Sequence, residues 1–414
     1  MAAEDRPADV LGPAAREAGG RIRATLAARF RDLDPAEDAF AEACVRAAQT
    51  WPGEGVPRDP AAWLYRAAFR AALDQRRRQA VRLRLQPDPP PPSPTAEEAL
   101  VYDARLIPDE LLRLIFVCCH PAVAVEARAA LTLKLVCGLS TAEIADAFLI
   151  AEPALAQRLV RAKRKIAEAG VPFEVPSPDG WAERMDAVLS TLEIAYAKAH
   201  ADAAGAGPHA GYAEEMLRLT ALLVQLAPED GEARAMAALV RYAEARRPAR
   251  LDDTGAMTPL SEQDPALWRR SLILEANVHL AEAERLGAQS ARALNAAIHG
   301  VWCSRRSLSD PPPWRRVLIL YDAMLERRDD VVVRLNRCVA VAEVKGVDAG
   351  LTELSALPGP GLARFQPYHA VRADLLRRAG RRAEAAEAYT CALDLAAGPA
   401  ERLWLERMRR QVAD

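Results

Sequence analysis

The chain contains 414 residues, of which 51% are hydrophobic and 5% aromatic, and it carries a formal net charge of −2. A chain of this length is expected to form roughly two to four domains, and its nearly neutral charge excludes a bulk attraction to nucleic acid, so any DNA contact must come from local clusters of cations. Alanine, leucine and arginine dominate the composition, which predicts an all-α fold. No signal peptide or membrane span is predicted, so we expect a cytoplasmic protein.

The first helical unit is predicted over residues 14–85. Glu37, Asp38 and Glu42 fall on neighbouring turns of one helix and form an acidic face suited to a basic protein partner. A second helix follows, with Asp59 as its N-cap and Pro60 at its first helical position.

This second helix combines aromatic residues and arginines. Rings can stack on unpaired bases while cations hold the backbone, so the pattern is suited to single-stranded DNA. The alternative is that Trp63, Leu64 and Leu73 belong to the core and that the arginines are solvated. The candidate DNA-binding residues of this unit are Trp63, Tyr65, Arg66, Phe69, Arg70, Arg76, Arg77 and Arg78.

A proline-rich linker is predicted over residues 86–96, because such a run favours an extended polyproline conformation over a helix. It separates the first unit from a second, predicted over 97–170. Within the second unit, the Cys118-Cys119-His120 sequence lacks the spacing of a zinc site, so we predict buried thiols and no metal.

The segment 139–166 has the pattern of a helix-turn-helix. Ser140 and Glu143 have the spacing of a capping box, and the second helix is predicted to begin at Pro153. Its apolar face consists of Leu155, Leu159, Ala162 and Ile166.

The opposite face of that helix is suited to a DNA groove. Arginine pairs with guanine and glutamine with adenine, so Gln157 and Arg158 can read base edges, while the cations that follow suit phosphates. The alternative is an ordinary helical hairpin with a solvated basic face. The candidate DNA-binding residues here are Ala154, Gln157, Arg158, Arg161, Lys163, Arg164 and Lys165.

The remainder of the chain, 181–414, is predicted to be a long helical extension. Gly380, Ala385, Tyr389 and Ala392 match the pattern of a tetratricopeptide helix pair, with a weaker echo over 333–357. Both a groove for a protein partner and an irregular solenoid packed on itself fit this pattern.

The order of these elements resembles the extracytoplasmic-function sigma factors of bacterial RNA polymerase, in the subgroup with a long helical extension that ends in tetratricopeptide-like repeats. The motifs that carry the resemblance are Ala36-Glu37-Asp38, Asp59-Pro60-Ala61-Ala62-Trp63-Leu64, residues 109–116, Thr141-Ala142-Glu143-Ile144-Ala145, residues 156–163, Gln263-Asp264 with Trp268, and Leu335-Asn336-Arg337.

The resemblance implies two partners, core RNA polymerase and promoter DNA. The acidic face of the first unit would bind polymerase, the aromatic and arginine helix would hold melted minus-ten DNA, and the helix-turn-helix would read the minus-thirty-five element. The extension would control these units in cis. Neither a cofactor nor a catalytic residue is expected, so we do not predict an enzyme.

Two other functions stay open. Ala41 stands where the family usually carries glutamine, and Arg70 stands where its minus-ten helix usually carries asparagine. These departures favour a helical protein-binding adaptor whose sigma-like domains no longer initiate transcription. A homodimeric repressor that uses only the helix-turn-helix is the third possibility, and the acidic helix argues against it.

Overall fold

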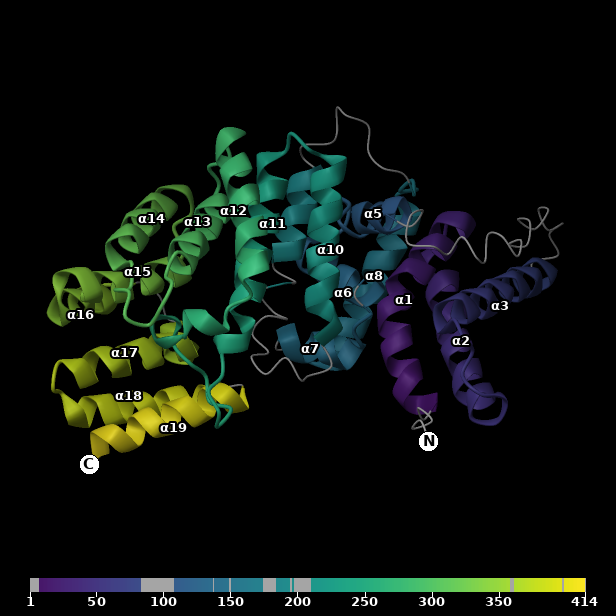
Figure 1. The fold of residues 1–414 in the computed structure, drawn as a ribbon. Coiled ribbons are helices and arrows are strands. Elements are labelled where there is room, and N and C mark those ends of the chain that lie inside the picture. Colours follow the sequence, from purple (N-terminus) through teal and green to yellow (C-terminus); the bar gives the residue numbers. More distant parts are fainter. Residues whose placement is uncertain are drawn as a thin grey trace. The chain divides into compact units, whose positions relative to one another are not determined.

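A computed structural model of the chain describes residues 7–82, 108–136, 138–148, 150–173, 184–193, 196, 210–357, 361–396 and 398–413. The chain forms two compact units, residues 1–199 and 200–414. Within the described ranges the elements are α-helices and short 3-10 helices, with one isolated bridge between Leu251 and Met257 (Figure 1). The predicted all-α fold is therefore confirmed.

The first unit begins with a three-helix bundle: α1 (Pro7–Phe30), α2 (Leu33–Glu54) and α3 (Pro60–Arg82). The predicted start of α3 is confirmed, because Asp59 Oδ1 accepts a hydrogen bond of 2.9 Å from the backbone of Ala62. The bundle is closed by large buried side chains: Ile22, Leu26, Phe40, Trp51, Leu64 and Phe69.

In the described residues that follow, the helices are shorter: α5 (Pro108–Cys118), α6 (Val125–Leu135), α7 (Thr141–Phe148) and α8 (Glu152–Glu168). Helices α7 and α8 form the predicted helix-turn-helix. Helix α8 begins at Glu152, one residue earlier than predicted, and Pro153 takes its second position. The side chain of Glu143, and with it the predicted capping box, lies outside the described residues, as does the linker 86–96.

A helical stretch over residues 184–193 belongs to the core of the first unit. Arg184 Nη2 donates a hydrogen bond of 2.6 Å to the carbonyl oxygen of Phe116 in α5. Met185, Val188 and Leu192 are buried. This stretch therefore completes the second half of the unit, and a fragment that ends before it would expose apolar surface.

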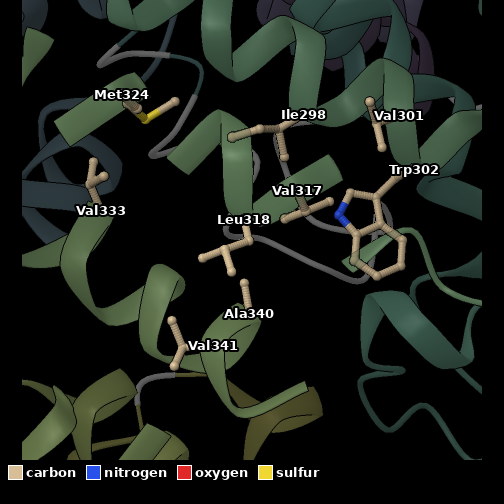
Figure 2. Close-up of a cluster of buried hydrophobic side chains, with 9 residues drawn as sticks. All are labelled: Ile298, Val301, Trp302, Val317, Leu318, Met324, Val333, Ala340 and Val341. Carbon is tan, nitrogen blue, oxygen red and sulfur yellow. The ribbon is translucent and has the colours of Figure 1, made fainter. Parts of the chain in front are cut away.

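The second unit is a succession of helices that pack on their neighbours in the chain (Figure 1). They are α10 (Ala210–Leu226), α11 (Gly231–Arg246), α12 (Arg270–Arg285), α13 (Ala291–Cys303), α14 (Trp314–Arg327), α15 (Val331–Lys345), α16 (Val347–Ser355), α17 (Gln366–Arg378), α18 (Arg382–Leu395) and α19 (Pro399–Ala413). Figure 2 shows the core that α13, α14 and α15 share, with Trp302, Leu318 and Val341 among its side chains.

The last helices form the hairpins that the sequence predicts. Gly380, with a φ of 76°, makes the turn between α17 and α18, and Gly346, with a φ of 100°, makes the turn between α15 and α16. Ala385, Tyr389 and Ala392 are buried between α17 and α19. The predicted helix pair is thus confirmed, and the weaker echo is a helical hairpin as well.

Candidate polymerase and DNA interfaces

Helix α8 is held by its apolar face and leaves most of its polar face exposed. Leu155, Leu159, Ala162 and Ile166 are all buried, as the spacing predicted. On the other side Ala154, Gln157, Arg161, Arg164 and Lys165 are exposed, and Arg158 is half-buried. A rigid helix with this exposed basic face has the form that enters a DNA major groove.

Val160 was missed by the sequence interpretation. It lies on the exposed side of α8 between Gln157 and Arg161, and its side chain is 61% exposed. An apolar group at this position can contact the methyl group of thymine, which is accessible in the major groove. The signal in the sequence was a valine on the polar side of an amphipathic helix, where a polar residue is expected.

Lys163 occupies a different environment from the other cations of α8. Its side chain is 16% exposed, and its Nζ lies 2.5 Å from Asp34 Oδ1 and 3.1 Å from Glu37 Oε2. Burial opposes the charged amine, but the hydrogen bonds and charges of these two carboxylates outweigh it and raise the pKa of Lys163. In this conformation Lys163 therefore binds α2 and is not available to a phosphate.

The ion pair between Lys163 and Glu37 leaves only part of the acidic face of α2 exposed. Asp38 and Glu42 are exposed, and Asp38 Oδ2 accepts a hydrogen bond of 3.3 Å from Gln75. Glu37 is largely covered. Val45, one turn beyond Glu42, is 56% exposed. It was missed as well, and it adds an exposed apolar residue at the end of the acidic face, of a kind that protein interfaces bury.

Two aromatic residues of α3 do not lie where the sequence interpretation placed them. Tyr65 and Phe69 are 4% and 1% exposed. The Phe69 ring lies 5.8 Å from the ring of Phe30, and Arg29 stacks over it at 5.1 Å. Both rings are core residues of the bundle, which corrects the expectation that they stack on unpaired bases in this conformation.

The remaining candidates of α3 lie on accessible surface. Trp63 is half-buried and packs edge-on against Trp51, with ring centroids 5.5 Å apart. Arg66, Arg70 and Arg77 are exposed at helical spacing along one face. Of the other two candidate arginines, Arg76 is half-buried and Arg78 is exposed. Arg78 Nε donates a hydrogen bond to the carbonyl oxygen of Asp74. A basic ridge thus runs along α3, with one tryptophan near its start.

The adjacent thiols at the end of α5 lie in the core of the first unit. Cys118 and Cys119 are both fully buried, and burial raises the pKa of Cys119. The sulfur of Cys119 lies 3.8 Å from the hydroxyl of Thr132. Among the residues that the structure describes, no three His, Cys, Asp or Glu side chains gather closely enough to hold a metal ion.

Comparisons with known proteins match three segments of the chain to family models. Residues 15–82 match Sigma-70 region 2, and residues 113–166 match Sigma-70, region 4. Residues 184–284 match a family of unknown function, DUF6596. The region 2 segment covers most of α1 and all of α2 and α3, and the region 4 segment contains α7 and all but the last two residues of α8.

A protein of Rhizobium meliloti (strain 1021), itself named as uncharacterized, is similar to nearly the whole chain. It is 37% identical over 383 residues, which cover 91% of this chain and 89% of that protein. No solved structure matches. Over the part of the chain that can be described, no helix is both long and apolar enough to cross a membrane.

Proposed function

Because the chain belongs to the sigma-70 family, as an extracytoplasmic-function-like sigma factor with a C-terminal helical extension, we propose that it directs core RNA polymerase to specific promoters and initiates transcription there. The observation that carries the proposal is α8. Its four buried apolar residues fix the helix, and they leave a basic face with Gln157, Val160 and Arg161 at its centre.

The roles of the first unit divide between two surfaces. Asp38, Glu42 and Val45 form the exposed part of the polymerase-binding face, in which Glu37 joins them once it is released from Lys163. Acidic residues beside an exposed apolar residue suit a basic helical partner, because the charges steer association and burial of the apolar residue adds affinity.

The basic ridge of α3 is the candidate surface for melted promoter DNA. Arg66, Arg70 and Arg77 would hold the phosphates, and Trp63 would supply the stacking surface. The burial of Tyr65 and Phe69 leaves fewer rings for bases than the sequence suggested. This burial also supports the second candidate function, a protein-binding adaptor that no longer opens promoters.

We assign the extension a regulatory role in cis. A tethered domain sees its target at an effective concentration near the millimolar range, so that even a weak contact can control the sigma domains. A groove of about 330 Å³ between α16 and α17, lined by Tyr368 and Arg372 among others, is the candidate site for a protein partner.

Two experiments test these assignments. Purified full-length protein should co-elute with core polymerase, and a chain that stays separate at all salt concentrations would remove the sigma-factor proposal. For the extension, full-length protein is compared with a 1–199 fragment at equal occupancy of polymerase. The fragment keeps the 184–193 helix that covers α5, and circular dichroism checks its folding. If the fragment and the full-length protein give equal transcript yields over a range of promoters, the proposal that the extension regulates in cis is refuted.

A further inference from the structure

The two halves of the first unit share a packed seam. Helix α1 of the first half lies against α5 and α6 of the second (Figure 1). Arg23 is 8% exposed, and its Nε donates a hydrogen bond of 2.9 Å to the carbonyl oxygen of Leu135. Its guanidinium also stacks over the ring of Phe40 at 4.8 Å. One buried arginine therefore contacts both halves.

Gly20 marks the closest approach in this seam. A Cβ atom at this position would lie 2.1 Å from the carbonyl oxygen of Val136. That oxygen belongs to the backbone, so it cannot move aside as the end of a flexible side chain would. Glycine is a poor helix former, and its place in the middle of α1 is explained by this contact.

An ionic clasp closes the two halves at a second point. Lys163 of α8 lies between Asp34 and Glu37 of α2. Lys134 of α6 approaches the other oxygen of Glu37 at 3.9 Å. Two lysines of the DNA-binding half thus hold one carboxylate of the polymerase-binding helix.

The base-reading face of α8 is partly enclosed in the same arrangement. Val160 and Arg164 line an open cleft of about 1440 Å³, together with Arg29 and Arg31 of the first half. Val160, the residue proposed to contact a thymine methyl, therefore lines a cleft that it shares with the other half of the unit.

We propose that the first unit has a closed state, held by the Gly20 seam and the Lys163 clasp, that competes with core polymerase for the α2 face. This inference rests on the proposed function. Glu37 is covered in the closed state, with Lys163 at one carboxylate oxygen and Lys134 near the other, so a polymerase cation would have to displace a lysine of α6 or α8 to pair with it. Lys163 cannot reach a phosphate while it is held. Full engagement of the α2 face, Glu37 included, therefore requires the clasp to open, which frees Lys163 at the same time.

The strength of the clasp suits a reversible switch. Asp34 is 63% exposed, so its pair with Lys163 is screened by solvent and contributes modestly. If only the open molecules bind polymerase fully, the apparent Kd is the Kd of the open state divided by the fraction of molecules that are open. We expect that release of the closed state raises the apparent affinity by about two- to tenfold.

The closed state itself is tested without polymerase. A zero-length carbodiimide reagent joins an amine to a carboxylate only when the two are in contact, and mass spectrometry of the monomeric full-length protein then locates the link. We expect a link from Lys163 to Asp34 or Glu37 in the wild type. Gly20→Ala should reduce it strongly, whereas Gly53→Ala should not, because nothing lies within 4 Å of the Cβ position at Gly53.

The consequence for polymerase is tested with the same variants in full-length protein. Gly20→Ala should bind core polymerase more tightly than Gly53→Ala. Lys163→Met should bind more tightly than Lys165→Met, which removes an equal charge from the exposed side of α8. The second pair keeps the test valid if Gly20→Ala fails to fold.

The outcomes are separable. Absence of the Lys163 link in the wild-type monomer overturns the closed state. A normal link with no gain in affinity for Gly20→Ala and Lys163→Met overturns its inhibitory role. If neither the wild type nor any variant binds core polymerase, the proposed function fails and the inhibitory role fails with it, while the cross-linking pattern still decides whether the closed state exists.

Discussion

Val160 gives a prediction with a magnitude that follows from its exposure. Val160→Ala removes two methyl groups from a side chain that is 61% exposed on the base-reading face. Burying a group of this size contributes about 0.8 kcal/mol, so two groups scaled by the exposed fraction give about 1 kcal/mol, or roughly a fivefold weaker Kd for the preferred upstream promoter element.

The assay uses the holoenzyme and a promoter duplex selected from a random pool. Fluorescence anisotropy gives the Kd for wild type and Val160→Ala on the thymine duplex and on duplexes with deoxyuridine at single positions, which lack only the methyl group. At one position the losses of binding free energy from Val160→Ala and from the deoxyuridine substitution should be non-additive, because each change removes one side of the same contact. Val278→Ala is the matched control, since Val278 is 63% exposed on α12 in the extension.

The reasoning would be refuted by either of two results. One is a Val160→Ala variant that binds as tightly as the control. The other is a loss that is additive with every deoxyuridine substitution, since the valine would then act through the fold of α8 and not through a thymine methyl.

Three further predictions concern docking, stability and pH. Reversal of Asp38 and Glu42 to lysine should weaken binding to core polymerase and make the remaining binding less sensitive to salt; an unchanged affinity across a salt series would remove this face from the interface. Trp51→Ala should lower the free energy of unfolding by about 3–5 kcal/mol. Trp51→Phe should lower it much less, because the indole nitrogen is buried without a hydrogen-bond partner, and equal losses in urea denaturation would contradict this. Burial and nearby arginines lower the pKa of His279 from 6.5 to about 4. The unfolded chain then takes up a proton first, so stability should fall as the pH drops from about 6.5 to 4, and His279→Gln should flatten that dependence.

Local patterns predicted the elements well because they depend on periodicity. The spacing of Leu155, Leu159 and Ile166 identified the buried face of α8, and the Asp59 cap identified the start of α3. Glycines at hairpin turns predicted the last helix pairs. Each of these signals lies within about one or two turns of the chain, so no knowledge of distant contacts was needed.

The errors arose where distant residues decide the environment. Tyr65 and Phe69 lie on the inner side of α3, but only the packing of α1 against them makes that side the core. The pairing of Lys163 with Glu37 joins positions 126 residues apart, which no local pattern predicts. Val45 and Val160 were missed for a different reason, because only charged and polar residues were considered as binding residues on the polar sides of α2 and α8, although periodicity places both valines there.

Promoter-dependent transcription in a reconstituted system tests the central claim most directly. Core polymerase is incubated with full-length protein and with promoters selected by the holoenzyme, and the transcript ends are mapped. We predict transcripts that begin at fixed positions and depend on the added protein. A protein that binds core polymerase tightly but yields no promoter-dependent transcript on any selected duplex would contradict the account and leave the adaptor function in its place.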